Sequence, residues 1–552
     1  MILQQLIQYY QENTDSLPAF GCEYKEISFV VLLSVEGDFL DIQDTRTLTG
    51  EGGKMLVPQS VKRSGTGAYP NCLWDNLKYV FGIGSYKNAK QQESLQEKRI
   101  SFLNNVKRLS QTLSENKEVQ AVVRFLESDF LKKLEKHPLW KEIIKLNVYL
   151  SFSVENTHRL VCQEDSVMQA ISSFSKSQSE EESSFCLLTG NVDPVARLHP
   201  IIQGVYGAQG SGASLISYNL DSVESFGKQQ GYNAPISESA AFAYSTALNH
   251  LLESSQKVAF NQSMTIVFWS QKKSCFEDVF SDFLKLSSKE SLTSVLSSFA
   301  ESEEDSLPFY VHALSPNGAR LSLRFSWTGS IGELKKRIKK HFEDLEVVNF
   351  AKDQKLYSIY SLLHAFSPCH DVKYIQPNLA GEFLFSVLND HAYPQNLLAT
   401  LIGSLSDEEG VSHKRVSLLK SCMNRSSGTV KLHSSLDLLN QNMGYLLGRL
   451  FAIFEAANKM SKKKKEGPTT YSFYKIASIV PKRIFPHLLN RYAIHMHSLP
   501  EKRVEYFQKI RDLVVESLVV FPSNLSLKDQ GQFAVGYYHQ KQKIFLEIKK
   551  DE

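Results

Sequence analysis

The sequence predicts an α+β fold, with a mixed β and helical N-terminal part over residues 1–405 and an all-α basic bundle over residues 411–552. Two observations predict this division. Apolar runs bounded by turn residues, which are typical of strands, occur in the first part, whereas the pattern is helical almost throughout from about residue 355. The basic side chains also concentrate in the last part of the chain, which indicates that the two parts have different surfaces.

The N-terminal segments mix helix and strand signals. Apolar residues at helical spacing predict an amphipathic helix that begins at Ile2. Two apolar runs around Gly37 predict a β-hairpin within residues 21–50. Residues 51–70 are rich in glycine and proline and predict a loop. Further elements are predicted as a strand or short helix at 75–83 and charged helices over 91–145.

The middle of the chain alternates between the two patterns. Residues 170–185 are rich in Ser and Glu and predict a surface loop or linker. Pro235 and Ser237 mark the start of a helix. The predicted helices are 238–255 and 331–345, and the predicted strands are 213–219, 263–270 and 319–329.

The C-terminal pattern is helical, with a few interruptions. These interruptions are Pro394, residues 407–410, residues 462–468, Pro481 and Pro486. A domain boundary is predicted near 405–411, and no internal repeat is found.

The bulk composition narrows the class of protein. No apolar run approaches the ~20 residues needed to cross a bilayer, and the N-terminus lacks the pattern of a signal peptide. The seven cysteines form no CxxC pair, which favours reduced thiols over disulfides or a structural zinc. We therefore expect a cytoplasmic protein.

The charge is distributed unevenly along the chain. Residues 411–552 hold 24 Lys and Arg against 11 Asp and Glu, a net charge of +13, whereas the first 410 residues carry −10. A strongly basic part indicates a polyanionic partner, and a solvated basic surface is the simpler alternative.

A glycine-rich stretch at Gly204–Asn219, GVYGAQGSGASLISYN, raises the question of what its backbone approaches so closely. Phosphate is one answer, a nucleic-acid strand is another, and an ordinary tight turn is the third. The spacing of its glycines matches neither a P-loop nor a dinucleotide fingerprint. Ser211 lacks the GxSxG context of a hydrolase, and His370-Asp371 alone is too little for a metal site. No enzymatic activity, cofactor or metal is therefore expected.

Two polar loops remain as candidates for nucleic-acid binding. The first has glycines and uncharged hydrogen-bonding side chains that suit a groove, and the second adds cationic side chains that suit phosphates. The candidate residues of the first loop are Gly207, Gln209, Gly210, Ser211 and Asn219. Those of the second loop are Lys62, Arg63, Ser64, Gly65 and Asn71.

Five segments of the chain are familiar. They are RLHPIIQGVYGAQGSGASLISYNLDSVESFGKQQGYNAPISESAAFAYSTALNHLL (197–252), VPQSVKRSGTGAYPNCLWDNLKYVFG (57–82), KYIQPNLAGEFL (373–384), GYLLGRLFAIFEAAN (444–458) and QGQFAVGYYHQKQ (530–542). In order and content the sequence resembles the Csd-type large subunit of the type I-C CRISPR effector complex, Cascade. Tyr218 and Phe226 depart from the expected pattern, although both keep an aromatic ring.

The resemblance implies a non-catalytic function. The family's complex carries a CRISPR RNA and searches double-stranded DNA, and its large subunit reads the protospacer-adjacent motif and helps to open the duplex and form the R-loop. It holds the 5′ end of the guide assembly beside backbone, guide-processing and small subunits, and it helps to recruit a helicase–nuclease in trans. The basic loop and Asn71 are then expected at the motif duplex, and Gln209 and Asn219 at the point of strand separation.

The C-terminal bundle resembles the small subunit of such complexes. Its charge suits a track for displaced single-stranded DNA, which Lys462, Lys463 and Lys464 are expected to join. The family also makes a separate small subunit from an internal start, and Met423 and Met443 are the candidates, giving products of 130 or 110 residues.

Two other functions stay open at this stage. One is a nucleic-acid enzyme, such as a metal-dependent nuclease whose ligands are scattered along the chain. The other is an RNA-binding scaffold that does not read a motif.

Overall fold

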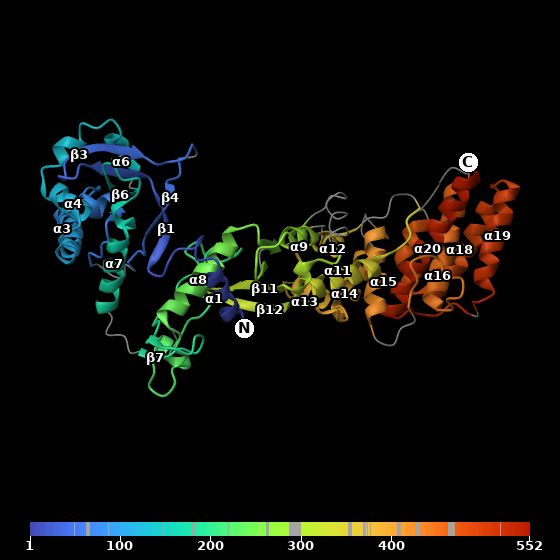
Figure 1. The fold of residues 1–552 in the computed structure, drawn as a ribbon. Coiled ribbons are helices and arrows are strands. Elements are labelled where there is room, and N and C mark those ends of the chain that lie inside the picture. Colours follow the sequence, from blue (N-terminus) through green and yellow to red (C-terminus); the bar gives the residue numbers. More distant parts are fainter. Residues whose placement is uncertain are drawn as a thin grey trace. The chain divides into compact units, whose positions relative to one another are not determined.

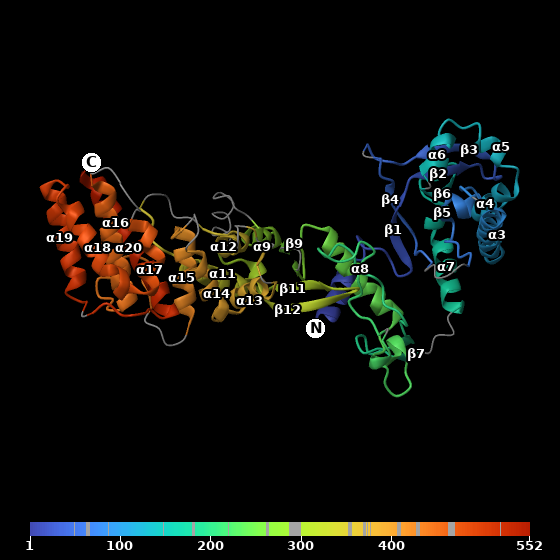
Figure 2. The same cartoon turned by 180° about the vertical axis from the view of Figure 1, so that it is seen from behind.

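A computed structural model provides the fold of the chain (Figures 1 and 2). It describes residues 1–552 except 49, 62–66, 87, 147, 179–182, 219, 261–263, 286–299, 351–355, 368–370, 372–373, 376, 406–409, 427–430, 462–469, 519 and 552. The chain forms two compact units, and each has its own core.

Unit 1 comprises Met1, residues 3–199 and residues 218–247. Its strands are β1 (Cys22–Ile27), β2 (Phe29–Leu33), β3 (Phe39–Asp44), β4 (Gly53–Pro58), β5 (Trp74–Asn76), β6 (Tyr149–Val154), β7 (Ser183–Phe185) and β8 (Val192–Pro194). Its helices are α1 (Ile2–Glu12), α2 (Leu77–Val80), α3 (Ala89–Thr112), α4 (Lys117–Glu127), α5 (Leu131–Leu134), α6 (Trp140–Leu146), α7 (Asp165–Gln178) and α8 (Glu238–Glu253), whose last residues count with unit 2.

A four-stranded sheet in the order β3-β2-β6-β5 forms the centre of unit 1 (Figure 1). Strand β2 is almost wholly apolar and buried, as a central strand requires, and it pairs in parallel with β6 and antiparallel with β3. The predicted hairpin around Gly37 is thus confirmed. Arg124 of α4 holds its turn by donating to the carbonyl oxygens of Val35 and Glu36, both at 2.7 Å.

Two predictions for unit 1 were wrong. Residues 53–58 form β4, which pairs antiparallel with β1, although residues 51–70 were expected to be a loop. Residues 170–185 were expected to be a surface loop or linker, but residues 165–178 form the helix α7. Val167 and Ala170 lie one turn apart on this helix and are buried in the core despite the serines around them. The ambiguous segment 75–83 contains the end of β5 and then α2.

Unit 2 comprises Ile2, residues 200–217 and residues 248–552. Its strands are β9 (Lys257–Phe260), β10 (Met264–Ser270), β11 (Pro308–Asn317) and β12 (Arg320–Ser330). Its helices are α9 (Phe276–Lys285), α11 (Ile331–Leu345), α12 (Ile359–Phe366), α13 (Pro377–Asn389), α14 (Gln395–Ser404), α15 (His413–Arg425), α16 (Met443–Met460), α17 (Tyr474–Ile479), α18 (Pro481–Met496), α19 (Glu501–Val515) and α20 (Leu527–Asp551).

The four strands of unit 2 form an antiparallel sheet in the order β12-β11-β10-β9. Every residue of β10 is buried, so this strand is central to the core. Phe268 of β10 packs on Phe280 of α9 at a ring separation of 5.0 Å, and Phe325 of β12 packs on Phe385 of α13 at 5.8 Å. The strands predicted at 263–270 and 319–329 and the helices predicted at 238–255 and 331–345 are confirmed to within two residues.

One hydrophobic cluster runs from this sheet through to the last helix. It joins residues before and after the predicted boundary at 405–411, for example Leu401 and Val416. Residues 406–409 themselves lie outside the described part of the chain. Pro481 begins α18, whereas Pro486 lies inside that helix, so the predicted break at Pro486 was wrong.

Helices α16 and α20 pack side by side along a seam of glycines. A Cβ atom on Gly444, Gly448 or Gly536 would collide with backbone atoms of the facing helix. This close approach also buries polar pairs between the helices: Tyr445 Oη lies 3.0 Å from His539 Nδ1. Burial lowers the pKa of His539 to about 3, so its ring is neutral in the folded protein.

Among the described helices, none combines the length and the apolar character needed to cross a membrane. The six cysteines that the structure describes are free thiols.

Candidate nucleic-acid interface

The glycine-rich stretch forms a closed loop over residues 202–213. Ile202 and Ala213 form an antiparallel bridge, and each amide donates to the other's carbonyl oxygen at 2.9 Å. Between them the chain makes two successive turns, closed by Ala208 N to Val205 O at 3.2 Å and Gly212 N to Gln209 O at 2.8 Å. The strand predicted at 213–219 was wrong for the described residues: Ala213 and Ser214 form isolated bridges, and no regular strand follows them.

The loop is attached to the sheet of unit 2. The amide of Tyr206 donates to Thr265 Oγ1 on β10 at 3.0 Å, and Val205 is buried. Beyond the closing bridge, Ser214 pairs in parallel with Arg320 at the start of β12. Asn249 of α8 accepts from the amide of Gln203 at 2.9 Å. The base of the loop is thus held at several points, so its shape is formed before any ligand arrives.

The reason why glycine is required differs from one position of the loop to the next. Gly207 and Gly212 adopt φ angles of 78° and 89°, which L-residues rarely adopt. A Cβ on Gly212 would also collide with the side chain of Ile201. Gly210 lies outside the positive-φ region, and a Cβ there would meet no atom within 4 Å. The fold therefore explains Gly207 and Gly212, but it does not explain Gly210.

The tip of the loop presents polar groups to solvent. Gln209, Gly210 and Ser211 are all exposed. Within the described residues, the side chains of Gln209 and Ser211 form no hydrogen bond. A side-chain amide can donate and accept at once, as a base edge does, and the bare backbone at Gly210 leaves room for a close partner. Asn219 lies outside the described residues.

The second predicted loop is described only at its two ends. Lys62, Arg63, Ser64 and Gly65 lie outside the described residues. Asn71 is only 2% exposed, and its side-chain oxygen accepts from the amide of Val61 at 3.0 Å.

The backbone of Asn71 is also bound within the protein. Its amide donates to Asp75 Oδ2 at 2.9 Å, and Asp75 is fully buried. Asn71 thus ties the end of the loop to its beginning. The expected contact of Asn71 with base edges stays a prediction, and the geometry instead gives this residue a positioning role.

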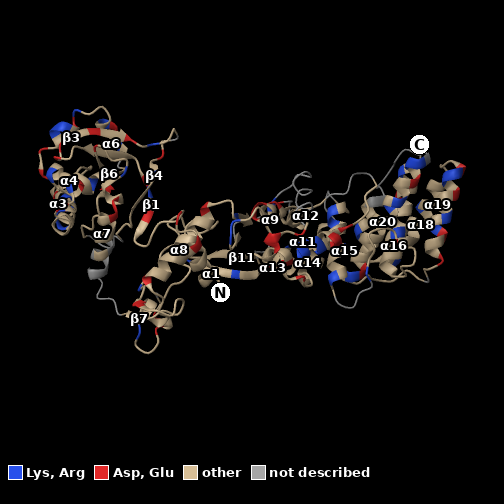
Figure 3. Cartoon of the chain, viewed as in Figure 1, with Lys and Arg blue, Asp and Glu red and all other residues tan. Residues whose placement is uncertain are grey.

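The C-terminal helices carry many exposed cations (Figure 3). They include Lys475 on α17, Lys482 and Arg483 at the start of α18, Lys502 and Lys509 on α19, and Lys528 on α20. In the described part of the chain, none of these six forms an ion pair. They are therefore available to a polyanion. Lys462, Lys463 and Lys464 lie outside the described residues.

The buried cations of these helices have structural roles. Arg415 is fully buried and donates to the carbonyl oxygens of Ala365 at 2.7 Å and Gly410 at 3.0 Å. Arg425 pairs with Asp344 at 2.8 Å. The positive charge predicted from composition is thus divided between core contacts and the surface.

The supporting residues Thr265 and Asn249 were not predicted from the sequence. Each lies in an ordinary strand or helix, and only the folded chain brings it to the loop.

No metal site is found in the described part of the chain, because no group of three or more His, Cys, Asp or Glu side chains there is placed to hold an ion. His370 is not among the described residues.

Comparison with protein families identifies a match for nearly the whole chain. A family model described as CRISPR-associated protein (Cas_Csd1) matches residues 6–545. A search of curated proteins found no significant match. The matched span contains the loop at 202–213, Asn71 and the glycine seam between α16 and α20.

Proposed function

We propose, from the premise that the chain belongs to the Cas_Csd1 family of CRISPR-associated proteins, that it is the non-catalytic large subunit of a type I-C RNA-guided DNA surveillance complex. In this role it recognises the motif beside the target, promotes duplex opening and R-loop formation, and helps to recruit a separate helicase–nuclease. Pairing with the CRISPR RNA then supplies the sequence specificity. Its partners are this RNA, the target duplex and the backbone, guide-processing and small subunits.

The observation that carries the proposal is the preformed tip at Gln209, Gly210 and Ser211. A rigid base limits the entropy lost when the tip enters a groove, and hydrogen-bonding groups without charge suit base edges more than phosphates. Gln209 can replace hydrogen bonds that bases lose when the strands part. The absence of a side chain at Gly210, which the fold does not require, supports close approach of a partner to this backbone.

The exposed lysines and arginines of α18, α19 and α20 support a second role. Exposed cations that form no ion pair within the described residues attract a phosphate backbone irrespective of sequence, and their binding releases counterions from it. We assign this surface to the displaced single strand. Lys462, Lys463 and Lys464 extend the proposed track.

The helix boundaries favour one of the two internal starts. Met443 is the first residue of α16, directly after the N-cap Asn442. A product from Met443 keeps α16 to α20 whole. A product from Met423 would begin inside α15 and divide that helix. We therefore propose Met443 as the start of a separate small subunit, which mass spectrometry of the purified complex tests.

The decisive measurement is DNA binding by the reconstituted guide complex with and without this chain. The probes are matched duplexes that differ only in the bases flanking the target. We expect the chain to confer a preference among flanks, and affinity to fall steeply between low and physiological salt. Equal binding to every flank, with guide RNA still bound, would instead indicate a scaffold that reads no motif.

A parallel incubation tests the non-catalytic part of the proposal. Purified chain is mixed with labelled DNA and divalent metal ions. The strands are expected to remain intact, and metal-dependent cleavage by this chain alone would establish a nuclease.

A further inference from the structure

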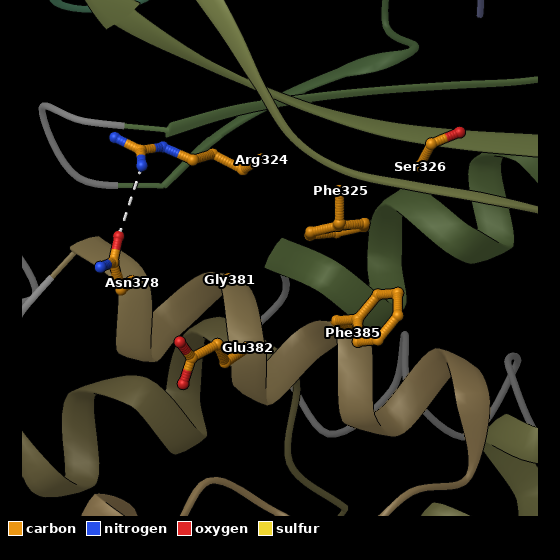
Figure 4. A pocket seen from close by; sticks show the side chains of 7 residues that line it. All are labelled: Arg324, Phe325, Ser326, Asn378, Gly381, Glu382 and Phe385. Carbon is orange, nitrogen blue, oxygen red and sulfur yellow. Dashed lines mark hydrogen bonds between the residues drawn. The ribbon is translucent and has the colours of Figure 1, made fainter. Parts of the chain in front are cut away.

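A surface pocket of about 380 Å3 lies between strand β12 and helix α13 in unit 2 (Figure 4). Its lining residues come from two segments more than 50 residues apart in the sequence. They are Arg324, Phe325, Ser326, Asn378, Gly381, Glu382 and Phe385. The volume lies within the range of small-molecule sites, about 300–1,000 Å3.

The inner part of the pocket is apolar and aromatic. The rings of Phe325 and Phe385 are 5.8 Å apart and tilted by 57°. Gly381 also lines the pocket, and there the backbone of α13 carries no side chain (Figure 4). Phe385 is only partly buried, so part of its ring is open to a ligand. Such a surface suits a flat ring that can stack.

One side of the rim supplies hydrogen-bond donors. The guanidinium of Arg324 donates to Asn378 Oδ1 at 3.5 Å, as Figure 4 shows. It also donates to Ser315 Oγ at 3.2 Å. Both acceptors are neutral, and the 3.5 Å distance to Asn378 is at the long limit for a hydrogen bond. Arg324 is exposed, so its fork can turn to a ligand at little cost.

The other polar group of the rim is an acceptor. Glu382 lies one turn after Asn378 on the same face of α13. Its carboxylate is exposed and, within the described residues, forms no hydrogen bond or ion pair. The Arg324 guanidinium donates to neutral acceptors and forms no ion pair with this carboxylate. Their separation leaves both available to a ligand that carries acceptors and donors.

We propose that this pocket binds one unstacked guanine base of a single-stranded nucleic acid. Guanine presents two acceptors, O6 and N7, which match the fork of Arg324. It also presents two donors, N1–H and N2–H, which match the two oxygens of Glu382. Phe385 supplies the stacking surface. The inference rests on the proposed function, since it adds a base-specific contact to a protein that handles displaced or unpaired strands.

Other bases fit this set of groups less well. Adenine lacks a carbonyl oxygen, and thymine and uracil offer a single N–H donor, so neither uses both Arg324 and Glu382 fully. Cytosine offers one amino group without a neighbouring N–H. A bare phosphate is disfavoured because the Glu382 carboxylate would repel it. Guanine is therefore the base that leaves the fewest rim groups unpaired.

The test measures binding of short labelled strands to the purified full-length chain. The probes are thymidine strands with a single central guanine, adenine, cytosine or thymine, together with a matching uridine series made of RNA. We expect the guanine probe to bind about 10-fold tighter than the uniform probe. Comparison of the DNA and RNA series shows whether the guanine belongs to the displaced strand or to the guide.

Three variants assign the preference to the pocket. Glu382→Gln removes one acceptor oxygen, Arg324→Lys removes the fork but keeps the charge, and Phe385→Leu removes the flat ring but keeps most of the packing volume. Glu382→Gln and Arg324→Lys are expected to abolish the guanine preference while the uniform probe binds as before, and Phe385→Leu is expected to weaken binding of the guanine probe. The matched control is Glu343→Gln, an exposed glutamate on α11 outside the pocket, which should keep the preference.

The outcomes separate this inference from the proposed function. Equal affinity for all bases, a preference that survives both Glu382→Gln and Arg324→Lys, or no binding of any strand overturns the guanine pocket. None of these results bears on the flank preference of the guide complex, which is measured on duplexes. Loss of flank preference with a retained guanine preference would instead overturn motif reading alone.

Discussion

The glycines at the tip of the 202–213 loop and those of the α16–α20 seam have opposite uses. In the seam, the space beside Gly444 and Gly448 is filled by the backbone of the facing helix, so the missing side chains bring two helices together and exclude water. At the loop tip, the space beside Gly210 is empty, and the bare backbone faces solvent. The same residue type thus buries the backbone in one region and exposes it in the other.

The difference teaches how to interpret a glycine-rich sequence. Where the fold itself fills the place of the missing Cβ, the glycine is explained by packing. Where nothing fills it and φ is ordinary, the fold gives no reason for glycine, and a partner becomes the best candidate. Gly212 belongs to an intermediate case, because its conformation requires glycine although it lies beside the exposed tip.

The largest effect is expected in the seam. Gly448→Ala places a methyl group against the carbonyl of Phe533 and should lower the free energy of unfolding by about 1–3 kcal/mol, since neither backbone can move aside cheaply. Thermal unfolding followed by circular dichroism measures it. The matched control is Gly403→Ala in α14, where a Cβ meets nothing within 4 Å and the helix should gain up to about 1 kcal/mol. Equal behaviour of the two variants would contradict the packing argument.

Acid should weaken the same seam. Because burial lowers the pKa of His539 to about 3, the unfolded chain, with a histidine pKa near 6.5, binds the proton more readily than the folded chain. The free energy of unfolding therefore falls as the pH drops from about 6.5 towards 3, by up to about 1.4 kcal/mol per pH unit for this group.

Comparison of two variants isolates the contribution of His539. His539→Asn should reduce the steepness of this pH dependence, whereas His497→Asn, at an exposed position that does not contribute to the pKa shift of His539, should leave it unchanged. An unaltered slope in His539→Asn would show that the buried ring does not control the response.

Local signals explain which elements could be predicted from the sequence. The hairpin around Gly37, strand β10 and helix α11 could each be predicted from a few neighbouring residues, by turn chemistry or by periodicity. Strand β4 could not be predicted in this way, because its partner β1 lies some 30 residues earlier and glycine and proline at its ends suggested a loop. Strand formation there depends on a distant partner.

The candidate sites likewise contain some features that local sequence predicts and others that depend on distant contacts. The glycine loop was visible as a stretch of sequence, but its attachment through Thr265 and Asn249 was not. The pocket was not predicted at all, since Arg324 and Asn378 come together only when α13 packs on β12. Alternation along β12 would have placed Arg324 on an outward face, yet nothing local indicates what lies opposite.

A smaller effect on stability is expected at Gly212. Gly212→Ala meets Ile201 and keeps a φ angle that alanine tolerates poorly, so it should cost about 1–2 kcal/mol, less than the seam variant if the loop relaxes. Hydrogen exchange at the amides of Ile202 and Ala213 reports whether the closing bridge opens. Protection as in the unchanged protein would show that the loop does not depend on this glycine.

The smallest effect on stability, and the most informative for function, is expected at Gly210. Gly210→Ala should change the free energy of unfolding by less than about 0.5 kcal/mol, because its Cβ enters open space. If the bare backbone at this position approaches DNA, the same methyl group should weaken binding of the guide complex to the preferred duplex by about 10-fold, the loss typical of one base contact. Gln209→Ala should act in the same direction, since it removes the side-chain amide. A Gly210→Ala complex that is as stable and binds as tightly as the original would leave the tip without a role in recognition, and the two glycine regions would then differ in exposure alone.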